Sequence, residues 1–437
     1  MRLSWLARAV VGVLLFTACS GNASPSAGGP AAGSPSASGG GGAASGSPAA
    51  GGGSLSDLPN ITGSAILSGW QSTPDEGKAL GDALLGFQAK YKTQVSYQPI
   101  SGDYKTVMVT KFSSHDVPDL FYVNAEYAPE WINQGFLEPL DDYISKSGFD
   151  TSKFYPGALS IFKGADGKTY GFPKDTNTIA LAYNTALVPN PPKTLDELVT
   201  MAKDMKGKNG LKAPMCLNAG LDRGLAFIYA QGGSLLSDDG KTDQVDSDAT
   251  KTAVQWYMDL FKDGLGMTSS DLGSGWCGEA LGKKQVAMVF EGGWLDPFMT
   301  STYPDVKYGW AQMPTGSSGQ PVTISYTVSY SIGADSKNKD QAFALLSYLT
   351  GPDGMKAWTA GGVALPSRSD VPTPAGKDVL SASSAFAKPG SGFVPGYVDI
   401  QKAFQDAFTL EIKNKTFTAG PVIDASKQSI DKALSGV

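Results

Sequence analysis

The chain contains one histidine, His115, in the polar sequence Ser-His-Asp, where a solvent-exposed surface position is the simplest interpretation. A Ser-His-Asp triad would have to use this residue, yet the GxSxG nucleophile motif is absent, as are HExxH and the phosphate loop GxxxxGKS/T. Lys241 stands in a calcium-like segment where an EF-hand needs an oxygen ligand, which favours a turn. The sequence therefore favours binding over catalysis. A glycosidase-type carboxylate pair stays open, because distances in space cannot be read from one sequence.

The elements that position binding groups alternate between strand and helix. The segments 61–70, 95–100 and 119–123 are predicted strands. The helix predicted after the first strand carries an apolar stripe formed by Leu80, Leu84, Phe87 and Tyr91. This alternation predicts βαβ units, a largely parallel sheet and the α/β fold class.

Polar and aromatic side chains follow two of these strands. Trp70 and Gln71 come directly after the first strand, and Asn124 and Glu126 follow the buried strand at 119–123. Ligands of open α/β sheets bind beyond the carboxyl ends of the strands, so these four residues are candidate contacts.

The N-terminal segment predicts export and a lipid anchor. Residues 1–18 carry Arg2 and Arg8 before an apolar run that is too short to span a bilayer, as in a secretory signal peptide. Phe16-Thr17-Ala18-Cys19 resembles the lipobox of bacterial lipoproteins, although Phe16 stands where Leu is usual. In that motif the cysteine thiol takes a diacylglyceryl group, so Cys19 is the expected lipidation site. The Gly-, Ala-, Ser- and Pro-rich residues 19–56 are an expected disordered tether with a reach of roughly 30–35 Å.

Length and charge limit the possible architecture and partners of the remaining chain. From about Leu55 to Val437 it is too long for one typical core and suggests two lobes. Loss of the two leader arginines makes the formal charge −8 instead of −6, which argues against nucleic acid and against adhesion to anionic lipids.

Cys216 and Cys277 are the two cysteines that remain after Cys19. An even pair in an exported protein is expected to form a disulfide, and closing a loop of this length would stabilise by about 4 kcal/mol. A metal site is the weaker reading, because two thiols and one histidine do not complete a tetrahedral shell.

Several ordered segments carry a family resemblance. They are PDLFYVNAEYAPEWINQGFLEPLDDY (118–143), GKTYGFPKDTNTIALAYNTALV (167–188), PPKTLDELVTMAKDM (191–205), GWCGEALGKKQVAMVFEGGWLDPF (275–298), SIGADSKNKDQAFALLSYLTGPDGMKAW (331–358) and GGVALPSRSD (361–370). In this order they resemble the extracellular solute-binding proteins of family 1, the carbohydrate receptors of ABC importers that include maltose-binding protein. The resemblance covers the chain from about residue 60 onward.

The resemblance implies a periplasmic-binding-protein-like fold, in which two α/β lobes are joined by hinge strands and bind ligand in the interlobe cleft. Lobe one is expected at 57–173 and 316–362, and lobe two at 176–308 and 366–437. The crossings are then expected near Lys174, near Met313-Pro314 and near Leu365-Pro366.

The resemblance also implies ligand contacts. Glu126 matches an acidic sugar-binding position, Asn177 matches a polar contact in the first crossing, and Trp294 matches the tryptophan on which the sugar ring stacks. The further candidates are Trp70, Gln71, Asn124, Asp175, Asp222, Arg223, Trp276, Glu291, Asp296, Tyr326 and Arg368. For three of them a structural role is the alternative: core packing for Trp70, packing on the disulfide for Trp276 and a lobe–lobe salt bridge for Arg368.

The function so implied is a lipid-anchored sugar receptor at the extracellular face of a bacterial membrane. It would deliver a mono- or oligosaccharide to the permease of an ABC importer, as a monomer without cofactor or metal and touching the membrane only through its lipid. A surface-anchored glycoside hydrolase with Glu126 or Glu291 as acid is the alternative function. A peptide, an anion or a polyol is the alternative ligand.

Overall fold

The computed structural model describes residues 61–71, 74–238, 240–362, 364–392 and 394–435. The predicted leader at 1–18, the predicted lipidation site Cys19 and the predicted tether at 19–56 lie outside these residues. Among the helices of the described ranges, none is both long and apolar enough to cross a membrane.

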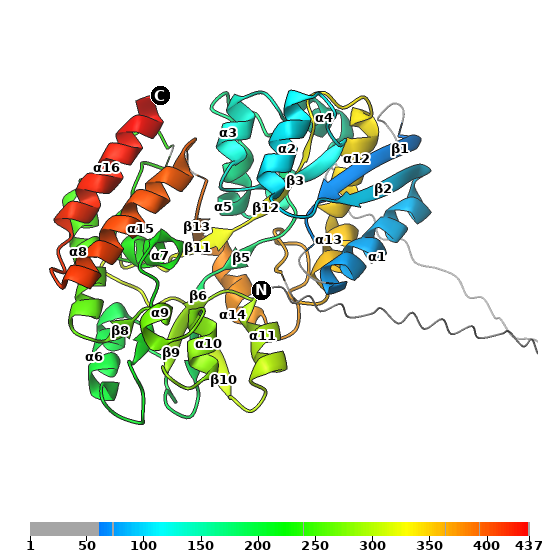
Figure 1. The fold of residues 1–437 in the computed structure, drawn as a ribbon. Coiled ribbons are helices and arrows are strands. Elements are labelled where there is room, and N and C mark those ends of the chain that lie inside the picture. Colours follow the sequence, from blue (N-terminus) through cyan, green and yellow to red (C-terminus); the bar gives the residue numbers. More distant parts are fainter. Residues whose placement is uncertain (1–60, 72–73, 239, 363, 393, 436–437) are drawn as a thin grey trace, which may run out of the picture. The chain divides into compact units, whose positions relative to one another are not determined.

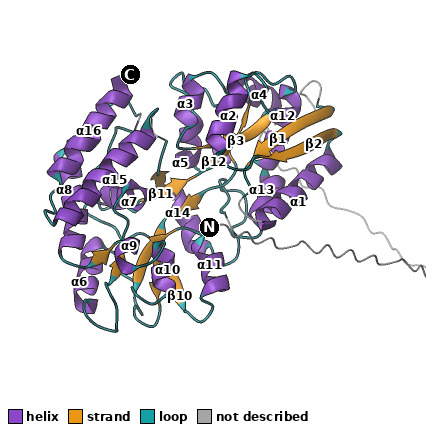
Figure 2. Ribbon diagram, in the orientation of Figure 1, coloured by secondary structure: helices purple, strands orange, loops and turns teal. Residues whose placement is uncertain are grey.

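The first sheet joins strands from distant parts of the chain (Figures 1 and 2). Across the sheet the order is β2 (Thr93–Pro99), β1 (Gly63–Gly69), β3 (Leu120–Asn124), β12 (Val328–Ile332) and β4 (Phe172–Pro173). Strand β1 runs parallel to β2 and β3, whereas β12 runs antiparallel to β3 and β4. The three predicted strands are confirmed as β1, β2 and β3, in a sheet that is mixed because β12 returns from late in the chain.

Helices of the same segments enclose this sheet. They are α1 (Pro74–Lys90), α2 (Tyr104–Ser113), α3 (Ala128–Asn133), α4 (Asp141–Ser147), α5 (Pro156–Leu159), α12 (Lys339–Leu349) and α13 (Pro352–Thr359), with the 3₁₀ turns η2 (Thr151–Lys153) and η3 (Ser160–Phe162). The predicted stripe of α1 is confirmed, because Leu80, Leu84 and Phe87 are buried in the core of this sheet. That core also contains Trp131 and Phe343.

The second sheet has the order β10 (Tyr308–Ala311), β6 (Ala180–Asn184), β9 (Met288–Glu291), β7 (Met215–Cys216) and β8 (Gly266–Met267). Its helices are α6 (Leu195–Met205), α7 (Leu221–Ala230), α8 (Asp248–Lys262), α9 (Ser269–Leu272), α10 (Cys277–Gly282), α11 (Leu295–Thr302), α14 (Asp378–Ser383), α15 (Tyr397–Asn414) and α16 (Gly420–Ser435), with the 3₁₀ turn η4 (Ser384–Phe386). Helices α15 and α16 pack side by side (Figure 1). The capping residue predicted for α6 is confirmed, because the Thr194 hydroxyl accepts from the Glu197 amide at 3.1 Å.

A third, short sheet connects the two. Its order is β13 (Ala387–Pro389), β11 (Thr323–Tyr326) and β5 (Asn177–Thr178). The chain leaves the first sheet at Pro173 and enters this sheet at Asn177, and it returns between Tyr326 and Val328. The two crossings are tied together where the Thr327 hydroxyl donates to the Asp175 carbonyl at 2.7 Å.

The packing shifts two of the predicted lobe boundaries. Val322 and Ile324 belong to the core around the second sheet, although 316–362 was assigned to lobe one. The reason is that β11 pairs with β5 and β13, so the chain crosses near residue 327 rather than near Met313. Val371 packs in the core of the first sheet, although it was assigned to lobe two.

Candidate ligand-binding site

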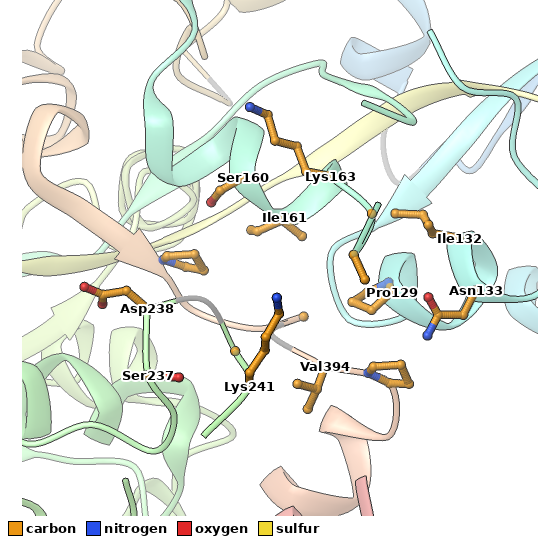
Figure 3. A pocket seen from close by; sticks show the side chains of 16 residues that line it. Pro129, Ile132, Asn133, Ser160, Ile161, Lys163, Ser237, Asp238, Lys241 and Val394 are labelled. Carbon is orange, nitrogen blue, oxygen red and sulfur yellow. The ribbon is translucent and has the colours of Figure 1, made fainter. Parts of the chain in front are cut away.

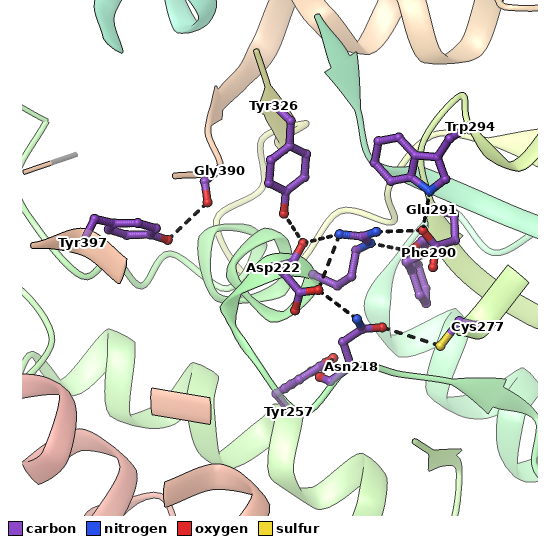
Figure 4. A network of polar contacts seen from close by, with 11 residues as sticks. Asn218, Asp222, Tyr257, Cys277, Phe290, Glu291, Trp294, Tyr326, Gly390 and Tyr397 are labelled. Carbon is purple, nitrogen blue, oxygen red and sulfur yellow. Dashed lines mark hydrogen bonds and ion pairs between the residues drawn. The ribbon is translucent and has the colours of Figure 1, made fainter. Parts of the chain in front are cut away.

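Arg223 is the centre of a polar network at the start of α7 (Figure 4). Its Nη2 donates to Oε2 of Glu291 at 2.8 Å, its Nε donates to the Phe290 carbonyl at 3.2 Å, and its Nη1 donates to the Asp222 carbonyl at 2.8 Å. The Arg223 side chain is 14% exposed and that of Glu291 is 2% exposed. The end of β9 and the first turn of α7 are therefore joined by a buried ion pair.

The neighbours of Arg223 keep it charged despite its burial. Desolvation by itself lowers the pKa of a guanidinium, but the charge of Glu291, assisted by Tyr326 and Asp222, outweighs this and raises the pKa of Arg223 above its ordinary value. Glu291 accepts from Arg223 and also from Trp294 Nε1 at 3.0 Å. Both partners donate to this carboxylate, an arrangement that suits a fixed acceptor rather than a proton donor.

Two aromatic rings cover the guanidinium. The ring of Trp294 lies 5.0 Å from the Arg223 guanidinium carbon, and the ring of Tyr326 lies 5.8 Å from it. Trp294 and Tyr326 meet edge to face at 6.3 Å, and the Tyr326 hydroxyl donates to the Asp222 carbonyl. A Cβ added at Gly292 would lie 2.5 Å from the Trp294 ring, so a glycine is needed where the indole folds back over the chain.

Asn177 brings an amide to the same cluster. Strand β5 pairs with β11 so that Asn177 lies opposite Tyr326. A Cβ added at Gly293 would lie 3.1 Å from Oδ1 of Asn177, which places this amide beside the turn that carries Trp294. Oδ1 of Asn177 is buried and has no hydrogen-bond partner among the described residues. The structure thus brings six predicted residues together, namely Asn177, Asp222, Arg223, Glu291, Trp294 and Tyr326.

The candidates from the first sheet form a separate group. Trp70 packs edge to face on Tyr104 and Tyr122, with centroid distances of 5.0 and 5.2 Å, so much of its surface is used for packing. Asn124 Oδ1 accepts from the Glu126 amide at 3.0 Å, which fixes the turn after β3. Gln71 is exposed beside Gly77 of α1.

Glu126 is partly buried, and this burial raises its pKa, an effect that the positive charge of Lys105 partly offsets. Because the pKa is higher in the folded than in the unfolded protein, ionisation of Glu126 costs stability as the pH rises through the folded value. We expect Glu126→Gln to raise the midpoint of thermal unfolding near pH 8 and to leave it unchanged near pH 3. Calorimetry across this range measures the difference.

The matched control for that measurement is Glu130→Gln. Glu130 forms a partly exposed ion pair with Lys105 at 2.9 Å, so its replacement removes a favourable contact and should not raise the midpoint. A stabilisation of the Glu126 variant that is equal at both pH values would contradict the electrostatic explanation.

Four other candidates are engaged elsewhere. Arg368 is 4% exposed and forms a two-pronged salt bridge with Asp370, both bonds at 2.8 Å, and its remaining contacts are the Asp150 carbonyl and two phenylalanine rings. Phe154 belongs to the core of the first sheet and Phe149 packs against it, so Arg368 pairs with Asp370 beside that core, and its predicted ligand contact stays a prediction. Trp276 packs edge to face on Phe298 at 4.8 Å, at the border of the small core that contains Cys216 and Cys277.

The two acids among these four have protein partners. Asp175 is 7% exposed and accepts from Lys174 and from Trp358 Nε1, while the Lys174 ammonium lies 3.8 Å from the Trp358 ring centre. Asp296 accepts from Lys377, Tyr308 and Trp310. Sequence reasoning missed Lys377 and Trp358 as partners, and no local motif marks them.

Asn218 was also missed. Its Nδ2 donates to Oδ2 of Asp222 at 2.9 Å, and it comes two residues after Cys216. The disulfide between Cys216 and Cys277 is confirmed, with Cα atoms 5.4 Å apart. No local motif marks Asn218, because it lies in the loop before α7, where a spacing of four residues does not place side chains on one side.

A pocket of about 260 Å³ has a different set of lining residues (Figure 3). Its lining residues include Pro129 and Asn133 of α3, Lys163, Lys241 and Pro395. None of the predicted ligand contacts is among its lining residues. Among the described residues no group of His, Cys, Asp and Glu has the arrangement of a metal site.

The sequence model of the family described as bacterial extracellular solute-binding protein matches residues 70–356. A binding protein of Brucella abortus is 27% identical over 276 residues, a match that covers 58% of this chain and 63% of that protein, so less than two thirds of the relative's length is spanned. Among solved structures, the sugar-binding protein MalE of Xanthomonas citri has a TM-score of 0.73 at 19% identity and covers 85% of this chain and 98% of that one.

A cyclic alpha-maltosyl-1,6-maltose binding protein of Arthrobacter globiformis has a TM-score of 0.73 at 20% identity, with 86% and 99% of the two chains covered. At this level of identity the structural likeness establishes the fold, which is the two-lobed fold of these receptors. Because the family match extends over more than half of the sequence, the chain belongs to the bacterial extracellular solute-binding proteins.

Proposed function

We propose that this protein is a receptor that binds a mono- or oligosaccharide in the cleft between its lobes and delivers it to the permease of an ABC importer. The observation that carries the proposal is the cluster of Trp294, Tyr326 and Arg223 beside the unpartnered Oδ1 of Asn177. A pyranose has apolar C–H faces that stack on an indole and a rim of hydroxyls that donate to amide and carboxylate oxygens. The sugar ligands of the two solved neighbours support the same ligand class.

The mechanism follows from contacts on both lobes. Glu126 comes from the segment after β3, whereas Arg223 comes from α7 and Trp294 directly precedes α11, beside the second sheet. A sugar that touches both groups favours the closed arrangement. The crossings at 174–176 and at Thr327 would absorb the change in backbone angles. The closed shape would then be the one that the permease recognises.

The anchor is part of the proposal. Diacylglyceryl transfer to Cys19, followed by the tether at 19–56, would hold a monomeric receptor at the extracellular face of a bacterial membrane. Mass spectrometry of the mature N-terminus tests this arm independently of ligand binding, because an unmodified residue 19 would leave the receptor without its anchor.

Replacement of Trp294 by alanine tests the ligand site. We expect the dissociation constant for the best sugar of a panel to rise about 30-fold, or about 2 kcal/mol, because Trp294 is partly buried and a tryptophan that a ligand covers is a typical hot spot of binding energy. Calorimetric titration of the wild-type protein and the variant measures it. Trp294→Phe is the control, since it keeps an aromatic face and should lose much less.

The same titrations address the alternatives. Sugar that is bound tightly and recovered intact supports the receptor, whereas release of shortened sugar would establish a glycoside hydrolase. Binding of a peptide, an anion or a polyol in place of every sugar would keep the receptor fold and change the ligand class.

A further inference from the structure

We propose that Asn218 is a positioning residue that holds Asp222 and, through it, Arg223 in the geometry that binds the ligand. The inference rests on the proposed function and concerns a residue that makes no contact with Arg223, Glu291 or Trp294 itself. Figure 4 shows Asn218 between Cys277 and Asp222, which lies in the first turn of α7.

Asn218 is held from three directions. Its Nδ2 donates to Asp222 Oδ2 at 2.9 Å, and its carbonyl accepts from the Tyr257 hydroxyl of α8 at 2.8 Å. Its Oδ1 lies 3.5 Å from the sulfur of Cys277. Its backbone is held by α8 and its amide lies against the disulfide. These contacts fix the orientation of the side chain, so that Nδ2 points at Asp222.

Asp222 transmits this position to Arg223. Its Oδ2 is the atom that Asn218 contacts, and the same oxygen lies 3.7 Å from Arg223 Nη1. Its carbonyl accepts from Arg223 Nη1 and from the Tyr326 hydroxyl. A displacement of Asp222 therefore moves both groups that flank the Trp294 ring.

The disulfide restrains the loop that carries Asn218. Cys216 ends β7, two residues before Asn218, and Cys277 begins α10. Both cysteines are buried, at 1% and 3% exposed. The loop 217–220 between β7 and α7 is thus bound to α10 at one end and to α8 through Tyr257.

The decisive variant is Asn218→Asp, in which a carboxylate oxygen would face Asp222 Oδ2 across a hydrogen-bond distance. Two such carboxylates repel when both are ionised, and they form an O–H···O bond when they share one proton. The charged and titratable groups in contact with this network are Asp222 and Arg223 of α7, Tyr257 of α8, Glu291 of β9 and Tyr326 of β11, and Asp271, Lys413 and Lys415 line the same pocket as Asn218. The wild-type protein has the same surrounding groups, so the variant differs from it only by the carboxyl pair that residue 218 forms with Asp222.

We expect the dissociation constant of Asn218→Asp, relative to wild type at the same pH, to be raised roughly tenfold near pH 8 and only about twofold near pH 5. Asn218→Ser, which removes the amide without adding charge, should weaken binding by a similar factor at both pH values. Asn414→Asp at the exposed end of α15 is the matched control and should bind like wild type.

If Asn218 had only a structural role, the ratio of the dissociation constants of Asn218→Asp and wild type would be the same at both pH values. That result would overturn the inference. So would wild-type affinity in both Asn218 variants. Circular dichroism identifies a variant that has unfolded, in which case Asn218→Ser carries the comparison and must show weakened binding. A wild-type protein that binds no sugar at either pH overturns the proposed function, and the inference with it.

Discussion

Replacement of Arg223 by methionine is expected to lower the free energy of unfolding by about 3–5 kcal/mol at neutral pH, the usual cost of breaking a buried ion pair on one side. The reason is Glu291, which is 1% exposed and would remain in the interior with Trp294 as the one donor left to it among the described residues. Urea denaturation followed by far-ultraviolet circular dichroism measures the change.

A second substitution identifies the cause of that loss. In the double variant Arg223→Met with Glu291→Gln no buried charge is left, so much of the stability should return. Lys402→Met removes an exposed pair with Asp406 and should change stability by less than about 1 kcal/mol. A double variant as unstable as Arg223→Met alone would show that packing, rather than the stranded charge, determines the loss.

Conversion of both Cys216 and Cys277 to serine is expected to cost about 4 kcal/mol, because the bond closes a loop with a sequence separation of 61 residues. The bonded atoms are buried beside Asn218, so the change should also weaken ligand binding if the positioning proposal holds. Denaturation in urea, with and without a thiol reductant, measures the change in the free energy of unfolding.

The matched measurement is the wild-type protein after reduction, which should unfold at the same urea concentration as the double serine variant. A change of less than about 1 kcal/mol in both would mean that the unfolded chain keeps these segments together without the bond.

Local elements could be predicted well because their signals lie within a few residues. The stripe on α1 and the cap of α6 depend on neighbours three or four positions away, and both are found as expected. The pairing of the two cysteines followed from their number alone. The placement of residues 323–326 in the connecting sheet could not be predicted, because it depends on which strands β11 pairs with, and no local pattern records this.

The residue types of the site can be read from the sequence alone: an indole after two glycines, an adjacent acid and base at a helix start, and an amide in the first crossing. Which of these side chains remain available to a ligand depends on the fold. Asp296 is neutralised by Lys377, which stands 81 positions away, while Arg223 reaches Glu291 across 68 positions. Charges choose partners by distance in space, and that distance is set by the order of strands in a sheet rather than by spacing along the chain.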